Sequence, residues 1–295
     1  MEQYKLIHSL STADSIVKRN NVDLFMHASY FFLSCLYAKI NGFHITLHTD
    51  EFGAELLKHA PYNEIIIDIK KPEGLSDKFF AWPKFVALEN SPIDAIHIDG
   101  DVILRSLYLK DLLWKPTDCI CQCEENKLIN KLINKMYGKI YNISAEAMKD
   151  CWYPEWANRE CNIMYNTSVI GLFNNDLRKE WMDTYWKMTK EYKEKGNYIE
   201  GSCHDIIVEQ QFLRDLIIKK DYSCNFVIDE KEDFDKMNLE ASSKGYLHVM
   251  NDKRRMLESC LQNIIMINPF LRQEILRMQF ILGINKEEYK EIKLI

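Results

Sequence analysis

The residues best suited to chemistry are two aspartates, Asp99 and Asp101, which follow an apolar run and are separated by Gly100. In an extended chain their carboxylates lie on the same side, and the glycine lets the backbone bend and a ligand approach closely. Two carboxylates this close repel each other unless a cation sits between them. Hard oxygen ligands select Mg²⁺ or Mn²⁺, which complete their coordination with water and substrate phosphates. The pair therefore predicts a metal-bound phosphate compound, and a solvated strand end is the alternative.

The elements around this motif alternate between short apolar strands and longer helical patterns, which predicts an α/β fold with a mainly parallel sheet and helices on both faces. The motif would then end the fourth strand, at the carboxyl edge where ligands of open α/β sheets bind. Strands are expected at 4–10, 44–50, 64–69, 95–104, 118–124, 162–173, 225–229 and 245–250, and helices at 22–41, 51–59, 79–90, 126–138, 176–195 and 203–220.

Helix-capping signals and a late helical tail complete the predicted organisation. Asn175 is expected to cap helix 176–195, and Ser202 with Asp205 to form a capping box for helix 203–220. We expect a catalytic domain at 1–252, with a nucleotide-binding half at 1–115 and an acceptor-side half at 116–252. A C-terminal helical extension is expected at 253–295, broken or kinked at Pro269.

Composition excludes several classes of protein. The 295 residues include 38 Lys plus Arg against 44 Asp plus Glu, a net charge of −6, so a nucleic-acid partner is not expected. The hydrophobic share of 47% is enough for a large core and excludes intrinsic disorder. The N-terminus lacks the pattern of a secretory signal, and the uncharged run 24–38 is shorter than the roughly 20 residues of a membrane span.

Nine cysteines, an odd number in a chain too large to need disulfides, favour a reducing compartment, and we expect a cytoplasmic protein. Cys119, Cys121 and Cys123 alternate along one expected strand. Because alternate residues of a strand step about 6.6 Å apart, three thiolates there are too far apart for one zinc ion. We therefore interpret them as buried free thiols.

With its Asp-x-Asp at the end of the fourth strand, the sequence resembles the nucleotide-sugar-dependent glycosyltransferases of the GT-A fold. It is most similar to uncharacterised bacterial glycosyltransferase-like families near the capsular-polysaccharide and retaining sugar transferases, over roughly residues 4–253. The resemblance implies a GT-A-like, Rossmann-related sheet and a Mn²⁺ or Mg²⁺ cofactor bound by Asp99 and Asp101. It also implies a nucleotide-sugar donor, foremost a UDP-sugar, and a glycan or lipid-linked acceptor.

Two later motifs carry the same resemblance. Asn166-Thr167-Ser168-Val169 matches a polar group that follows the Asp-x-Asp in those families, which implies that Asn166 faces the sugar or acceptor. Ser168 stands where many relatives have Gly. His248 matches the late histidine that serves as third metal ligand, with Lys253 on the diphosphate, although the family's histidine-glycine-lysine spacing is not reproduced. The alternatives are a polar strand start and a histidine that is merely hydrogen-bonded.

The resemblance extends to a helix and two loops. Similar families place an acidic or amide residue beside the anomeric carbon, which implies Glu209 or Gln210 here, and an exposed helix face carrying Asp205 and Glu209 is the alternative. The nucleotide base is implied to lie near the first-strand loop and the second-strand end, and Lys84 is implied to reach ribose or phosphate. Surface or capping roles are the alternatives. The loop and strand-end residues are Ser9, Ser11, Thr49 and Asp50.

We therefore expect a metal-dependent glycosyltransferase, with retention favoured by the match at Asn166 and His248, acting in surface-polysaccharide or glycan synthesis. One alternative is a phosphohydrolase of the haloacid-dehalogenase type, whose Asp-x-Asp is followed by Thr or Val where this chain has Ile103. The other is a protein of the same fold that only binds nucleotide or carbohydrate. Basic residues 253–255 beside apolar residues at helical spacing predict either peripheral contact with the inner face of the membrane or packing against protein.

Overall fold

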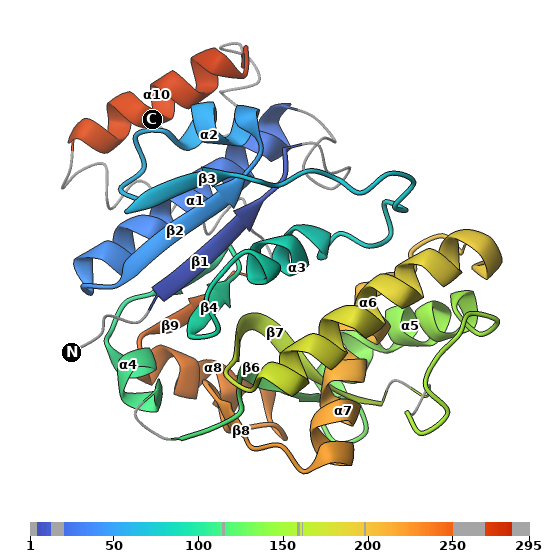
Figure 1. Ribbon diagram of the computed structural model, residues 1–295. Helices are drawn as coiled ribbons and strands as arrows, with labels where there is room; N and C mark the ends of the chain where they lie inside the picture. Colours follow the sequence, from blue (N-terminus) through green and yellow to red (C-terminus); the bar gives the residue numbers. More distant parts are fainter. Residues whose placement is uncertain are drawn as a thin grey trace.

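A seven-stranded sheet runs through the molecule, with helices packed on both of its faces (Figure 1). The computed structural model describes residues 5–12, 21–113, 116–157, 160, 162–197, 199–249 and 269–284. Lys253 and the basic and apolar residues that follow it, on which the diphosphate and membrane predictions rest, lie outside the described residues.

The strand order is β3-β2-β1-β4-β7-β6-β8. Neighbouring strands are parallel in four pairs (β1–β2, β1–β4, β2–β3 and β6–β8), and β7 is antiparallel to both of its neighbours. The predicted α/β class with a mainly parallel sheet is confirmed. The strands are β1 Lys5–Leu10, β2 His44–Thr49, β3 Glu64–Ile67, β4 Ala95–Ile98, β6 Cys119–Asn126, β7 Ile163–Leu172 and β8 Cys224–Phe226.

The helices cover the sheet because their apolar sides form two buried clusters with it. One cluster joins α1, α2 and α10, and the larger one contains α3, α6 and α7. The uncharged run 24–38 is the buried middle of α1, as predicted. The helices are α1 Asn21–Ile40, α2 Glu51–Leu57, α3 Trp82–Glu89, α4 Tyr108–Leu113, α5 Lys131–Ala147, α6 Asn175–Lys195, η1 Ile206–Gln211, α7 Phe212–Lys220, α8 Phe234–Ser243 and α10 Pro269–Ile281.

A second, two-stranded sheet pairs β5 (Val102–Leu104) with β9 (Tyr246–His248) in antiparallel fashion. The single strand expected at 95–104 is therefore wrong. The chain turns after β4, where the Val102 amide donates to the Asp99 carbonyl at 3.0 Å, and it continues into the small sheet. This break carries the Asp-x-Asp out of the main sheet, so that its two aspartates lie in a turn rather than in an extended strand.

Several helix starts differ from the predictions, among them that of α3, which begins at Trp82 rather than at 79. β6 continues to Asn126 because its pairing with β7 extends to Ile163, so the helix expected from 126 begins only after the Asn130 cap. The cap of α6 is Asn174 rather than Asn175. The Ser202–Asp205 capping box does not form: a π-helical turn, η1, precedes α7, and Asp205 makes no side-chain cap. Helices α4 and α8 were not predicted.

The described part of the C-terminal extension packs against the domain. α10 contributes to the cluster that holds α1 and α2 (Figure 1). Glu274 accepts from His59 at 2.8 Å and from Arg277, and the Arg277 guanidinium donates to the Leu56 carbonyl at 2.6 Å. None of the helices in the described ranges combines the length and apolarity that crossing a membrane requires.

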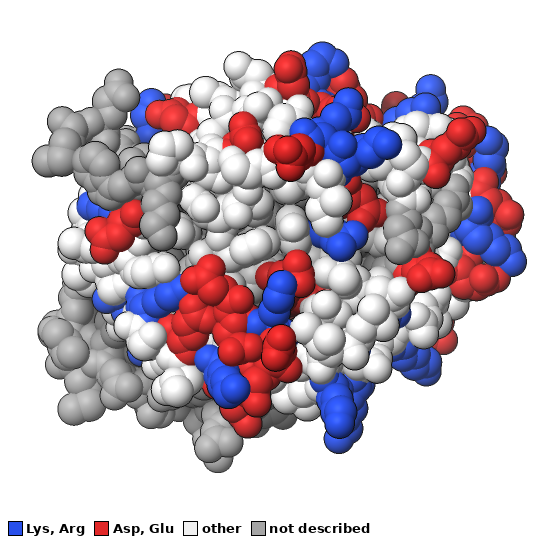
Figure 2. Space-filling model, turned by 90° about the horizontal axis from the view of Figure 1, so that it is seen from below, with Lys and Arg blue, Asp and Glu red and all other residues white. Residues whose placement is uncertain are grey.

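Acidic and basic side chains are mixed on the face seen in Figure 2, with one concentration of Asp and Glu near its lower part. The described residues of that face form no continuous basic surface.

Gly245 controls how the chain enters β9. It has a φ of +68°, and an added Cβ would lie 2.6 Å from the Ser106 Cβ, whereas Gly283 has a similar φ of +64° with open space around it. We expect Gly283→Ala to lower the free energy of unfolding by about 1 kcal/mol through backbone strain alone. Gly245→Ala should lower it by about 2–4 kcal/mol, because overpacking adds to the strain. Urea unfolding of both variants measures the difference, and equal losses would contradict the close packing.

Candidate functional site

A cavity of about 360 Å³ opens where α1, α3, η1, β7 and the turn after β4 meet. Its size suits a small-molecule ligand. Aromatic side chains form part of its wall and charged side chains part of its floor, so it offers both apolar contact and ionic recognition. The lining residues are Ser9, His27, Tyr30, Phe31, Phe80, Ala81, Pro83, Lys84, Asp99, Gly100, Asp101, Thr167, Glu209 and Gln210.

Asp99 and Asp101 line this cavity, and His248 converges with them from outside its lining. One ligand atom from each lies within 4.8 Å of the other two, and the Nε2 atom of His248 is 3.6 Å from an Asp101 carboxylate oxygen. The Nδ1 atom of His248 is buried and has no hydrogen-bond partner. Two carboxylates and an imidazole form a set of oxygen and nitrogen donors that suits Mn²⁺ better than Mg²⁺. These three residues could therefore hold a divalent cation.

Strand pairing explains how residues so far apart in the sequence meet. β4 delivers Asp99, whose amide donates to the Ser168 carbonyl of β7 at 2.8 Å. Asp101 follows in the turn, and its carbonyl accepts from the Val249 amide at 3.1 Å. In the small sheet, Val102 is the register partner of His248. The third donor is thus brought to the motif by β9.

Gly100 makes a close contact that was not predicted. Its φ is not positive, and a Cβ at this position would lie 2.2 Å from the Phe31 ring. The close approach that glycine permits is therefore made by an aromatic side chain of α1 that also lines the cavity. Phe31 was not identified from the sequence, because its place in an apolar helix marks it only as a core residue.

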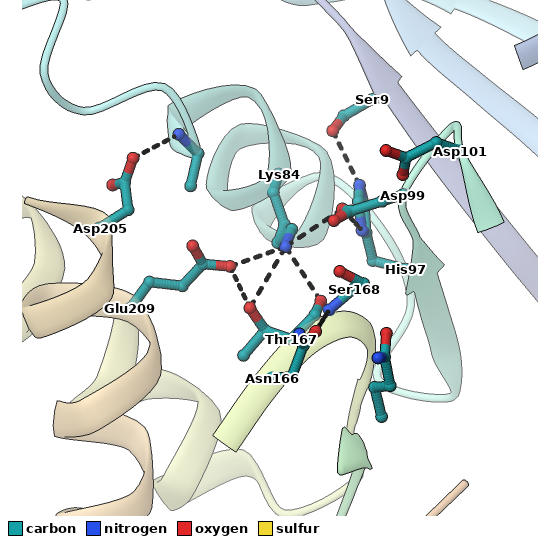
Figure 3. Close-up of polar contacts among 12 residues, drawn as sticks. Ser9, Lys84, His97, Asp99, Asp101, Asn166, Thr167, Ser168, Asp205 and Glu209 are labelled. Carbon is teal, nitrogen blue, oxygen red and sulfur yellow. Dashed lines mark hydrogen bonds and ion pairs between the residues drawn. The ribbon is translucent and has the colours of Figure 1, made fainter. Parts of the chain in front are cut away.

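Lys84 is the buried cation of the site (Figure 3). Its ammonium group donates to Glu209 at 2.7 Å and to the Thr167 carbonyl at 2.9 Å, and it lies 3.2 Å from the Asp99 carboxylate. Burial opposes the charge of Lys84, but the Asp99 and Glu209 carboxylates outweigh burial and raise its pKa. Burial also opposes ionisation of Asp99, yet Lys84 holds the pKa of that carboxyl well below its ordinary value.

Glu209 and Asp205 are buried rather than exposed, so the predicted alternative of an exposed helix face is wrong. Their exposed fractions are 2% and 0%. Both belong to the segment around η1, and one π-helical turn often marks a functional site. Asp205 accepts from the Ala81 amide at 3.0 Å, and burial, reinforced by the nearby Glu209, raises its pKa well above the ordinary value. Gln210, half-buried at the cavity wall, follows Glu209 directly.

Asn166 lies behind the cavity. Its amide donates to Glu125 at 2.8 Å. Its oxygen accepts from the Ser168 amide at 3.0 Å (Figure 3). It is not among the lining residues, whereas its neighbour Thr167 is. Thr167 donates its hydroxyl proton to Glu209 and so links β7 to η1. In this arrangement Asn166 orients the β7 backbone.

The residues predicted near a nucleotide base divide into two groups. Ser9 lines the cavity, and its hydroxyl lies 2.8 Å from the Nε2 atom of His97 (Figure 3). Burial, and next the Lys84 charge, lower the pKa of His97 well below its ordinary value, so this imidazole is neutral. Thr49 donates to the Leu10 carbonyl and Asp50 caps α2, and neither lines the cavity.

Residues 5–272 match DUF6734, described as a family of unknown function. A comparison with curated protein sequences found no match.

Three solved structures give weak likenesses. The glycosyltransferase GlyE in Streptococcus pneumoniae TIGR4 is 12% identical at a TM-score of 0.39, covering 76% of this chain and 45% of that chain. The galactosyltransferase LgtC, in complex with donor and acceptor sugar analogs, is 12% identical at 0.36, covering 69% and 70%. The 4-diphosphocytidyl-2C-methyl-D-erythritol synthase from Anaerococcus prevotii DSM 20548 is 9% identical at 0.33, covering 81% and 94%. This chain thus spans less than half the length of GlyE, and likeness at this level does not identify a reaction.

Removing the Lys84 cation should destabilise the fold. We expect Lys84→Met to lower the free energy of unfolding by about 3–5 kcal/mol, because it leaves Asp99 and Glu209 without their shared partner. Adding Glu209→Gln should recover part of the loss. Lys179→Met, which breaks an exposed pair with Asp183, is the control and should change stability by less than about 1 kcal/mol. Urea unfolding gives all three values, and a loss at Lys84 no larger than the control's would disprove the buried ion pair.

Proposed function

The chain belongs to DUF6734, a family of unknown function, and we propose that it transfers a sugar from a nucleoside-diphosphate sugar to an acceptor hydroxyl with the help of a divalent cation. The observation that carries this proposal is the convergence of His248 with Asp99 and Asp101, two residues that line a ligand-sized cavity. A hard cation bound there can take phosphate oxygens into its remaining coordination positions.

The donor set fits Mn²⁺, and Mg²⁺ second, in two respects. The two carboxylates and the imidazole supply acceptor atoms of suitable type, and the Nε2 atom of His248 lies on the carboxylate side, 3.6 Å from an Asp101 oxygen. When bound, the cation would offset the negative charge that accumulates on a departing diphosphate. Asp99, Asp101 and His248 would hold it, and Lys253, predicted to contact the diphosphate, lies outside the described residues.

The other side chains that line the cavity have different proposed roles. Lys84 keeps Asp99 ionised and fixes Glu209, so we assign it a positioning role, and its predicted contact with ribose or phosphate stays a prediction. Because one oxygen of Glu209 is engaged by Lys84 and Thr167, Gln210 is the better candidate to contact the sugar near its anomeric carbon. Phe31 and Phe80 provide apolar wall, and Ser9 is the member of the predicted base-contacting set that reaches the cavity.

Retention of anomeric configuration is part of the proposal. An inverting enzyme needs a general base to deprotonate the acceptor hydroxyl. The carboxylates among the described lining residues are Asp99, Asp101 and Glu209. The first two are assigned to the cation and the third is paired with Lys84, which leaves none of them available as that base.

The experiment that tests the function is a screen of UDP-, GDP-, CMP- and dTDP-sugars with and without Mn²⁺. Thermal shifts identify the bound donor, and release of the nucleoside diphosphate, or monophosphate for CMP-sugars, measures turnover. We expect a UDP-sugar to give the largest Mn²⁺-dependent shift, and NMR of the product reports its anomer. Phosphate release from simple monoesters without a sugar nucleotide would favour the phosphohydrolase alternative. Binding with no turnover under any acceptor would favour the non-catalytic one.

Asp101→Asn should abolish Mn²⁺-dependent donor binding. The amide lacks the negative charge that a hard cation prefers, and we expect Mn²⁺ affinity to fall at least about 100-fold. The metal-free variant should be as stable as the parent or slightly more stable, because a charge that repels Asp99 is gone. Calorimetric titration measures the affinity, with Asp183→Asn on the surface as control. Unchanged affinity in Asp101→Asn would refute the metal role.

His248→Ala tests whether the cation site has three protein ligands. Losing one neutral ligand should weaken Mn²⁺ binding by about 10–100-fold while far-ultraviolet circular dichroism stays unchanged. The matched control is His59→Ala. It removes an imidazole that is paired with Glu274 and does not belong to the Asp99–Asp101–His248 group. If both histidine variants bind Mn²⁺ as the parent does, His248 is not a ligand.

A further inference from the structure

Three thiols lie close together at the β8 edge of the main sheet. Cys119 and Cys121 are alternate residues of β6, and Cys224 is the first residue of β8, the last strand in the sheet order. The two strands run parallel, with Cys119 and Cys224 as register partners. The Sγ atoms of Cys119 and Cys121 are 3.6 Å apart, and all three Sγ atoms lie within 4.8 Å of one another.

The sequence pattern pointed to a different trio. Cys119, Cys121 and Cys123 alternate in sequence, but the pairing register of β6 with β7 shifts between Cys121 and Cys123. Cys123 is not part of the cluster, and the third thiol comes from a neighbouring strand. The argument that three alternate thiols lie too far apart holds within one strand. It does not cover a cluster in which two side chains come from one strand and the third comes from the neighbouring strand.

The surroundings of the cluster are apolar on one side and open on the other. Cys119 and Cys121 have exposed fractions of 0%, whereas Cys224 is partly exposed. All three are free thiols. Phe226, two residues after Cys224, packs edge-to-face on the Tyr165 ring, so aromatic side chains lie next to the cluster. An ion could reach the cluster from the Cys224 side.

We propose that Cys119, Cys121 and Cys224 form a second metal site, which binds a thiophilic cation such as Zn²⁺ or Cu⁺ through three thiolates. Soft sulfur ligands select these ions over the hard cations suited to Asp99 and Asp101. Three protein ligands leave a fourth position of a tetrahedral ion for water or a small thiol, on the exposed side. The thiols that are protonated beforehand release their protons to solvent when the metal binds.

Metal binding at this position would stabilise the pairing of the edge strand β8 with β6. β8 is only three residues long and forms its sheet pairing with β6. A cation shared by the two strands would add a cross-link at the first register pair, between Cys119 and Cys224. The second site would thus cross-link β6 and β8, and one strand, β7, lies between β6 and the strand β4 that leads to Asp99.

The test is a Cd²⁺ titration of the full chain, reduced and free of metal, followed by ultraviolet absorption. Cd²⁺ bound to thiolates gives a sulfur-to-metal charge-transfer band, which the carboxylate and imidazole donors of the other site cannot produce. We expect the band to saturate at one equivalent in the parent chain. The control Cys123→Ala, which changes a buried cysteine of the same strand outside the cluster, should give the same band.

Cys224→Ser is the decisive variant, because its partial exposure makes misfolding less of a concern than at the fully buried Cys119. It should lose most of the band and bind Cd²⁺ at least about 100-fold more weakly. Zn²⁺ should raise the melting temperature of the parent and of Asp101→Asn, but not that of Cys224→Ser. No band in the parent, or a band of equal strength and affinity in Cys224→Ser, would overturn the proposal. Either result would leave the proposed sugar transfer untouched.

Discussion

The site depends on the contacts that the buried ammonium group of Lys84 makes. It lies in the interior, within reach of Asp99, Glu209 and the Thr167 carbonyl, and thereby connects the end of β4, the π-helical turn η1 and β7. A buried charge without partners is very costly, so these three segments are stable together only in the arrangement that satisfies it. The cavity has a fixed floor for this reason, and the residues above it are held in place before a ligand binds.

The ion pair between Lys84 and Asp99 also determines how much negative charge remains to attract a cation. Asp99 is neutralised in part by Lys84, so the rim carries less than the full negative charge of Asp99 and Asp101. A divalent cation bound there would be incompletely neutralised by protein and would gain from further anionic ligands. The phosphate oxygens of a diphosphate supply such ligands, and binding of cation and donor should therefore be mutually favourable. This coupling follows from the placement of one lysine, independently of which sugar the donor carries.

The fold class and the place of Asp99 and Asp101 after the fourth strand could be predicted from alternating elements and a short motif, whereas His248 was implied only by the family resemblance. The role of Lys84 could not, since nothing in a Trp-Pro-Lys helix start tells whether a lysine points outward or inward. Asp205 and Glu209 were equally ambiguous, because their spacing of four suits a regular exposed helix as well as a buried π-helical turn. In each case the burial of the side chain depends on segments that are distant in the sequence, and the local sequence pattern does not encode it.

His248 shows how much of the site rests on strand register. It reaches Asp101 because β9 pairs with β5 so that His248 lies opposite Val102. Successive side chains of a strand point to opposite faces, and a slip of one residue would turn the imidazole away from both carboxylates. The register is anchored at the other end of β9, where the Gly245 carbonyl accepts from the Arg105 amide at 2.7 Å. The glycine turn at Gly245 thus controls whether His248 lies close enough to Asp99 and Asp101 to act as a third ligand of the proposed cation.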